Sequence, residues 1–233
     1  KRLNANKINT TSNKVKPESN EYAKTVQFNN YTKAFHQQRM SSSEIKRIGI
    51  LTGGGPASGH NQVIYSVVKA ATAMGITVIG ILEGWKGLIS ANLVEQAKPL
   101  TLEELEAHRI EGGTILKTSR ENPYEKDKQG NLKRPDAPLK LRENIQKLGL
   151  DALIPCGGDD TNSVAYRLQQ ELPEFPILGL PKTMDNDIDL PDGANTYGFD
   201  SYTRAAAAVL RGGQVDAKST KRVLVVEAFG RNA

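Results

Sequence analysis

Two acidic side chains, Asp159 and Asp160, follow Gly157 and Gly158 at the end of the apolar run Ala152–Cys156. Asp is a common capping residue at the start of a helix, so the pair has a purely structural interpretation. Two adjacent carboxylates beside a phosphate would repel it unless a cation lay between them. Mg²⁺ prefers one or two carboxylates together with phosphate oxygens. The pattern therefore favours a magnesium–phosphate site over a simple cap.

A second polar segment, Leu180–Asp187 (LPKTMDND), follows another apolar run and offers a cation, a hydroxyl and two carboxylates: Lys182, Thr183, Asp185 and Asp187. Asp185 and Asp187 are two residues apart, so in an extended loop they point the same way. A carboxylate near a hydroxyl can accept its proton as that oxygen attacks phosphorus. Asp-Asn-Asp also forms Asx turns readily, so the structural interpretation remains open here.

Three consecutive glycines, Gly53–Gly55, follow the apolar run Arg47–Leu51 and precede a segment with helical spacing. Without side chains, the backbone N–H groups of such a loop can approach an anion, and the following helix adds the positive end of its dipole. No lysine closes the segment, so it is not the GxxxxGK[ST] loop of many nucleotide-binding proteins. A tight strand-to-helix turn would use the same glycines.

Arginine flanks the last apolar run of the chain. Arg222 begins this run, and Phe229, Gly230 and Arg231 follow it. The guanidinium group suits bidentate recognition of phosphate. For either arginine taken alone, a solvated surface side chain is the simpler interpretation.

The segments between these residues alternate between strand-like and helix-like patterns. We predict strands at 47–51, 76–82, 152–156, 176–180 and 222–227 from their short apolar runs. We predict helices at 59–74, 101–108, 138–148, 161–171 and 202–210 from spacing and capping residues. This alternation predicts an α/β fold with a doubly wound, mainly parallel sheet flanked by helices. Ligands bind at the carboxyl ends of such strands, where the polar segments would meet.

The composition excludes several classes of protein. The 233 residues are 38% hydrophobic and 24% charged, as in ordinary globular proteins. No run approaches the roughly 20 apolar residues of a membrane-spanning helix, and no apolar run follows the basic N-terminal residues as in a secretory signal. The single cysteine, Cys156, excludes an intrachain disulfide and fits a cytoplasmic protein.

Positive charge is concentrated at the start of the chain. Residues 1–40 hold eight Lys or Arg and two Glu, a net of +6, whereas the whole chain carries +5, so the rest carries about −1. We predict that residues 1–43 form a disordered or non-native basic tail. Residues 44–233 would form the α/β domain, which holds all of the candidate phosphate-donor-binding and catalytic residues. The tail alone could serve as an arm for nucleic acid. A nucleic-acid-binding protein would carry its charge on the folded body, so we expect no such partner.

Taken together, these motifs resemble those of the phosphofructokinase family. The resemblance runs from about Lys46 to the end of the chain and is most specific at 157–161 (GGDDT), 181–187 (PKTMDND) and 225–231 (VVEAFGR). NAD kinases and diacylglycerol kinases share a similar glycine-aspartate turn, so the combination carries the identification. The resemblance implies a glycolytic phosphotransferase that acts on fructose 6-phosphate with Mg²⁺ as cofactor.

The resemblance also implies roles for individual residues. Gly54 would contact the phosphoryl donor, and Asp159 would bind the magnesium ion. Thr183 would contact the substrate. Asp185, assisted by Asp187, would take the proton from the attacking sugar hydroxyl.

The donor is implied by Asp160 and Lys182, at positions similar to glycines in ATP-dependent relatives. Asp160 would stand near the α-phosphate of ATP, and two like charges about 4 Å apart at an effective dielectric of about 20 cost on the order of 4 kcal/mol. Lys182, with Gly158 nearby, would serve a small anionic donor. The pair resembles the pyrophosphate-dependent branch, so we expect pyrophosphate and a sugar phosphate as the molecules bound.

Phe229, Gly230 and Arg231 stand where the family commonly has Met-Gly-Arg, and the resemblance implies that they hold the sugar phosphate. Phenylalanine here makes sedoheptulose 7-phosphate a plausible additional acceptor. Arg222 is similar to an arginine that reaches a neighbouring subunit's active site, which implies a homodimer or homotetramer. Ser119-Arg120 aligns with a segment near the transferred phosphate.

Two alternatives of the same fold remain, an ATP-dependent phosphofructokinase and a non-catalytic regulatory subunit. The retention of Asp159, Thr183, Asp185 and Arg231 argues against the second. The resemblance covers only the first half of the family's length, so we expect the isolated 233-residue fragment to be inactive.

Overall fold

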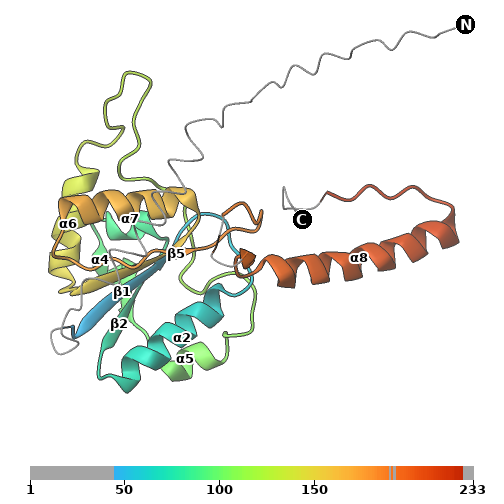
Figure 1. Cartoon of the computed structure of the whole chain (residues 1–233), viewed down its shortest axis with the longest axis horizontal. Helices are drawn as coiled ribbons and strands as arrows, with labels where there is room; N and C mark the ends of the chain where they lie inside the picture. Colours follow the sequence, from blue (N-terminus) through green and yellow to red (C-terminus); the bar gives the residue numbers. More distant parts are fainter. Residues whose placement is uncertain (1–44, 189, 191–192, 228–233) are drawn as a thin grey trace, which may run out of the picture. The chain divides into compact units, whose positions relative to one another are not determined.

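A five-stranded sheet forms the centre of the fold, and Figure 1 shows helices on both of its sides. The computed structural model describes residues 45–188, 190 and 193–227, so the predicted tail and Phe229–Arg231 lie outside the described residues. The strands are β1 (Arg47–Thr52), β2 (Thr77–Ile81), β3 (Ala97–Pro99), β4 (Ala152–Gly157) and β5 (Leu180–Pro181). Their order is β3-β2-β1-β4-β5, and only β3 is antiparallel to its neighbour. The predicted doubly wound, mainly parallel sheet is confirmed.

The helices form a layer on each face of this sheet (Figure 1). One layer holds α2 (His60–Ala73) and α5 (Leu102–Glu106), and the other holds α3 (Trp85–Leu88), α6 (Ala137–Lys147) and α7 (Asp159–Glu171). The chain also forms α4 (Leu93–Gln96) and α8 (Phe199–Thr220). Within the described ranges, every helix is too short or too polar to cross a lipid bilayer.

Two hydrophobic clusters join the layers through alternate residues of the strands. Ile50 packs with Ile64 and Val68 of α2, whereas Leu51 packs with the cluster under α6 and α7. Ile50 and Leu51 are both 0% exposed. Because successive strand side chains point to opposite faces, a sheet covered on both sides needs such continuous apolar runs. Each side chain buried in this way contributes about 1.5–3 kcal/mol.

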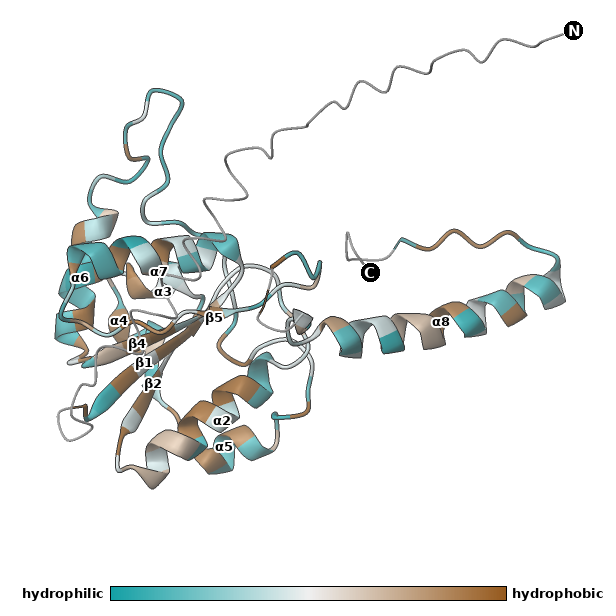
Figure 2. Ribbon diagram, in the orientation of Figure 1, coloured by the Kyte–Doolittle hydropathy of each residue, from teal (hydrophilic) through white to brown (hydrophobic). Residues whose placement is uncertain are grey.

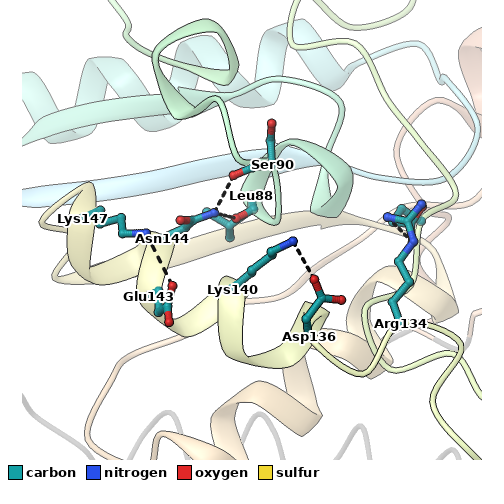
Figure 3. Close-up of polar contacts among 9 residues, drawn as sticks. Leu88, Ser90, Arg134, Asp136, Lys140, Glu143, Asn144 and Lys147 are labelled. Carbon is teal, nitrogen blue, oxygen red and sulfur yellow. Dashed lines mark hydrogen bonds and ion pairs between the residues drawn. The ribbon is translucent and has the colours of Figure 1, made fainter.

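A buried polar contact fixes α6 against the segment that contains α3. Asn144 is 4% exposed, and its Nδ2 donates to the carbonyl oxygens of Leu88 at 2.8 Å and Ser90 at 2.9 Å (Figure 3). The ion pairs that Figure 3 also shows on α6 are exposed and contribute about 0.3–0.5 kcal/mol each. The buried amide therefore does more than the surface charges to position this helix.

The predicted strand at 222–227 is wrong, because these residues form no strand in the structure. Val223 and Val225 are 93% and 90% exposed. A β-branched run favours extended backbone, but a strand exists only where another strand's edge accepts its hydrogen bonds. The local pattern contains no information about that edge.

The other predicted elements differ from the structure mainly at their ends, and the four-residue helices α3 and α4 were not predicted. The strand predicted at 176–180 is reduced to the two residues of β5 and an isolated bridge between Leu153 and Ile177. The helix predicted at 202–210 extends over all of α8, residues Phe199–Thr220. The three-residue β3 was not predicted, because it has no apolar run and its partner strand alone makes it a strand.

Candidate active site

A pocket of about 310 Å³ lies where β1, β4 and β5 end. Its walls come from the segments that follow these three strands and from residues 119–121. Many of the predicted site residues line it: Gly54, Gly158, Asp159, Asp160, Lys182, Thr183, Asp185 and Asp187. These residues meet because parallel strands end at the same edge of a sheet, whatever their distance along the chain.

The three glycines after β1 differ in the structural feature that favours glycine at each position. A Cβ at Gly53 would lie 2.4 Å from Oγ1 of Thr161, so the end of β1 packs directly on the first turn of α7. Gly54 has a φ of 81°, in the left-handed region that favours glycine. Gly55 has open space where a Cβ would stand. Only Gly54 and Gly55 line the pocket, and Gly53 serves packing.

The backbone N–H groups of this loop are partly used inside the protein. The N–H of Gly53 donates to the carbonyl of Cys156 and that of Gly54 to the carbonyl of Ser119, both at 2.9 Å. The Thr118 hydroxyl donates to the Gly54 carbonyl at 2.7 Å. The expected N–H cradle is therefore not formed by Gly53 and Gly54, and Gly54 contributes to the pocket the space that its missing side chain leaves.

The two carboxylates Asp159 and Asp160 begin α7 but do not cap it. The N-cap position belongs to Gly158, with extended backbone angles, and both aspartates lie in the first helical turn. The helix dipole favours negative charge there. Both side chains line the pocket, so the capping interpretation left open by the sequence does not account for them.

Lys182 brings a buried positive charge to the pocket. It is 4% exposed, its Nζ donates to the Gly55 carbonyl at 2.6 Å, and its backbone N–H donates to the Gly157 carbonyl at 2.8 Å. Burial lowers the pKa of the Lys182 ammonium, as does Arg120, while the Asp185 carboxylate opposes this. An ammonium so poorly hydrated gains more from an anionic ligand than a surface lysine would.

The segment after Lys182 is held in a defined turn. The Thr183 hydroxyl donates to an Asp187 carboxylate oxygen at 2.8 Å and accepts from the Asp185 N–H at 3.1 Å. Asn186, with a φ of 50°, donates through Nδ2 to Oδ1 of Asn195 at 2.9 Å. The local side-chain bond of this turn is therefore made by Thr183, Asn186 bonds across to Asn195 and Thr196, and Asp185 and Asp187 line the pocket.

The charges around the pocket are mostly negative. The charged residues among the described lining are Arg120, Glu121, Asp159, Asp160, Lys182, Asp185 and Asp187. Within the described residues, no group of three or more Asp, Glu, His or Cys is arranged to hold a metal alone. Mg²⁺ commonly takes one or two carboxylates and completes its shell with phosphate oxygens and water. These oxygen donors therefore fit an ion that binds together with a phosphate ligand.

Several lining residues were missed by the sequence analysis. Glu121 and Ile188 line the pocket without any motif that distinguishes them. Thr161 was seen only as part of GGDDT, yet its side chain is 3% exposed and lies against both Gly53 and Gly157. The glycines before Thr161 in the motif were a signal for this contact. A buried hydroxyl in the first turn of a helix packs against the residues that precede the helix, and small residues there leave room for it.

The predicted arginine sites are not part of this pocket as described. Arg222 is exposed and follows Lys221, the C-cap residue of α8, and it does not line the pocket. Phe229, Gly230 and Arg231 lie outside the described residues. Their predicted roles stay predictions.

A second hollow, of about 360 Å³, runs along α7 and is lined by Tyr124, Tyr166, Arg167 and four further residues. The Arg167 guanidinium lies 4.4 Å from the centre of the Tyr124 ring, and the Tyr124 hydroxyl donates to Glu171 at 2.9 Å. One face of the Tyr124 ring is therefore already covered by a side chain of α7.

Comparison with known proteins gives consistent results. The family model for phosphofructokinase matches residues 47–233. The chain is 37% identical over 189 residues to the pyrophosphate–fructose 6-phosphate 1-phosphotransferase of Thermotoga maritima, covering 81% of this chain and 43% of that protein. It is 36% identical over 191 residues to the ATP-dependent 6-phosphofructokinase of Chloroflexus aggregans, covering 82% and 52%.

The fold matches as well. The crystal structure of phosphofructokinase from Pichia pastoris superposes with a TM-score of 0.58 at 28% identity, covering 68% of this chain and 17% of that chain. The chain spans about half the length of the curated relatives it matches, and these relatives include both donor types.

Proposed function

The chain belongs to the phosphofructokinase family, and on that premise we propose that its protein transfers a phosphoryl group from pyrophosphate to the C1 hydroxyl of fructose 6-phosphate. The observation that carries this proposal is the meeting of Asp160, Lys182 and Asp185 in one pocket. Lys182 supplies positive charge to the donor, Asp185 is a potential base, and Asp160 is a carboxylate that would repel the α-phosphate of ATP. The products would be fructose 1,6-bisphosphate and orthophosphate, and the reaction should be reversible because pyrophosphate and the sugar bisphosphate have comparable phosphoryl-transfer potential.

In this proposal Lys182 binds the donor. Its buried ammonium, held by the Gly55 carbonyl, neutralises part of the pyrophosphate charge without a side-chain rearrangement at the moment of transfer. Gly54 and Gly158 leave room for the donor beside it. Among the described lining residues Ile188 is the one large apolar side chain, and such a lining suits a small, fully polar donor better than a nucleoside.

Asp185 is the proposed base. It takes the proton as the C1 oxygen forms its bond to the near phosphorus and the bond from that phosphorus to the bridging oxygen breaks. Asp187 accepts the hydrogen bond of the Thr183 hydroxyl and thereby orients that threonine toward the substrate. The two aspartates thus have different tasks, although their spacing makes them look equivalent.

Asp159, with Asp160 beside it, is the proposed ligand of a magnesium ion that binds with the donor. When bound, this ion would neutralise negative charge on the phosphates. Five of the seven charged residues in the described part of the lining are acidic, so a donor without a counter-ion would meet net repulsion.

ATP is the second candidate donor. The hollow along α7 is lined by the rings of Tyr124 and Tyr166, which follow pocket residues 119–121 and 158–161 in the chain. Some relatives are also named as ATP-dependent. Asp160 argues against it, as does the guanidinium that covers one face of Tyr124. Replacing Asp160 and Lys182 together by glycine should lower the rate with pyrophosphate and raise the rate with ATP.

The deciding experiment measures fructose 1,6-bisphosphate formation by the full-length protein with Mg²⁺ and either pyrophosphate or ATP as the only donor. Turnover with pyrophosphate alone supports the proposal. Turnover with ATP alone would overturn the argument from Asp160 and Lys182, and absence of turnover with both would favour a non-catalytic subunit. Sedoheptulose 7-phosphate should be assayed as a second acceptor.

The remaining proposals concern surroundings of the site. We place Phe229, Gly230 and Arg231 at the sugar phosphate and Arg222 at the site of a neighbouring subunit, in a homodimer or homotetramer, on the family resemblance alone. The single cysteine supports a reducing compartment, the cytoplasm.

A further inference from the structure

A buried polar cluster lies near Lys182, and the proposed reaction does not use it. It consists of His60 at the start of α2, Cys156 in β4 and Tyr197 just before α8. The hydroxyl of Tyr197 contacts Sγ of Cys156, and its ring lies edge-on to the imidazole of His60 with the ring centres 5.8 Å apart. His60 is 0% exposed.

The imidazole of His60 holds the backbone of Ala57. Its Nδ1 lies 3.1 Å from the Ala57 N and 3.2 Å from the Ala57 carbonyl oxygen, so Nδ1 accepts from one or donates to the other according to the tautomer. Both partners belong to the same residue. In either tautomer, therefore, the side chain fixes the position of Ala57.

This arrangement has a cost that a hydrophobic side chain would avoid. The second ring nitrogen, Nε2, is buried and has no hydrogen-bond partner among the described residues. A buried polar atom without a partner destabilises a fold, and such atoms in a native protein call for an explanation. Burial also lowers the pKa of His60 to about 4, with a contribution from Lys182, so the ring is neutral at physiological pH. The contact with Ala57 is the benefit that an apolar replacement would lose.

Ala57 lies two residues from the carbonyl that anchors the donor-binding lysine. The Gly55 carbonyl accepts from Lys182 Nζ at 2.6 Å. At the β1 end of the same loop, the N–H groups of Gly53 and Gly54 donate to carbonyls of other segments. The far end of the loop packs on Tyr197, because a Cβ at Gly59 would lie 2.9 Å from that ring. The imidazole of His60 is the side chain that bonds to the middle of this loop at Ala57, where the Ala57 carbonyl also accepts from the His60 N–H at 3.5 Å.

We propose that His60 is a positioning residue of the donor pocket, which acts through Ala57 and the Gly55 carbonyl to hold the Lys182 ammonium in place. This inference rests on the proposed role of Lys182 in donor binding. It assigns His60 no contact with the donor and no proton transfer. Loss of the imidazole nitrogen should weaken donor binding and leave the sugar site unaffected.

The test compares three forms of the full-length protein: wild type, His60→Leu and His60→Asn. Leucine fills much of the space but cannot bond to Ala57, whereas the asparagine amide can accept or donate at the position of Nδ1. For His60→Leu we expect the KM for pyrophosphate, and the Kd for pyrophosphate measured by calorimetry with Mg²⁺, to rise on the order of fivefold to tenfold. The KM for fructose 6-phosphate and the kcat should change less than twofold, and His60→Asn should restore most of the donor affinity.

A matched control separates positioning from loss of stability. Ile145 is a buried residue of α6 and does not belong to the loop between β1 and α2. Ile145→Val is a modest change in the core and should leave both KM values as in wild type. The inference is overturned if His60→Leu binds pyrophosphate as wild type does, if both KM values rise together, or if His60→Asn behaves like His60→Leu. A wild type that binds ATP but not pyrophosphate would overturn the proposed donor instead, and the same three forms measured with ATP would then decide the role of His60.

Discussion

Helices α7 and α8 are both amphipathic, but they differ in what their apolar residues meet. Among the 13 residues of α7, Thr161, Val164, Ala165 and Leu168 are buried against the sheet. Among the 22 residues of α8, none is buried. Figure 2 shows hydrophobic residues at intervals along α8 and a hydrophobic run in the segment that follows it.

The difference shows that a helical pattern is a local property, whereas burial depends on a neighbouring surface. Val209, Leu210 and Val215 on α8 are 69%, 45% and 62% exposed. The candidate active site is linked to α7, because Asp159 and Asp160 lie in its first turn.

The largest difference should appear in activity. In the full-length protein, Asp185→Asn should lower the kcat by about 10²- to 10⁴-fold, because an amide cannot accept the proton of the sugar hydroxyl. Asp216→Asn, on the exposed surface of α8, should leave the kcat within twofold of wild type. Steady-state rates with saturating donor measure both. Equal losses would mean that α8 takes part in the chemistry or that Asp185 does not.

The next difference should appear in stability. Leu168→Ala removes a side chain that is 0% exposed and should lower the free energy of unfolding by about 2–5 kcal/mol. Leu210→Ala, at a residue that is 45% exposed, should change it by less than about 0.5 kcal/mol in this chain. Urea denaturation of the two variants gives the comparison. A cost at Leu210 that equals the cost at Leu168 would mean that the apolar side of α8 is covered in solution.

A smaller effect on stability should follow from the titration of His60, which contacts the loop between β1 and α2. Burial and the nearby Lys182 ammonium lower the pKa of His60 from 6.5 to about 4. Between these values the unfolded chain binds a proton that the folded protein does not, so stability should decrease as the pH falls from about 6.5 to 4. The loss amounts to at most about 3 kcal/mol.

The variant His60→Asn, which cannot titrate in this range, isolates this contribution. Its free energy of unfolding should depend less steeply on pH between 6.5 and 4 than that of wild type, as measured by denaturation at a series of pH values. Identical slopes for the two proteins would show that the buried imidazole does not resist protonation. Residues 199–220 contain no histidine, so α8 makes no such contribution.

Sequence reasoning succeeded where one local pattern and one general rule were sufficient. The strands at Ala152 and Arg47 are short apolar runs, and the rule that parallel strands end at one edge brought Asp159, Lys182 and Asp185 to one pocket. It failed where a partner surface decides the outcome. The run at Val223–Val226 looks like a strand but has no strand beside it, whereas β3 becomes a strand only because β2 accepts it.

The sequence by itself determined most of the strands and helices, their amphipathic faces and the chemical groups available after each strand, because these depend on residue types at short spacing. The tertiary structure alone decided that Gly53 packs on Thr161 while Gly54 and Gly55 line the pocket, and that His60 holds Ala57. It also decided that the Lys182 ammonium is bound to the Gly55 carbonyl and largely removed from water. The contacts of Gly53 and Lys182 join residues far apart in the chain, and no local spacing encodes the distances between them.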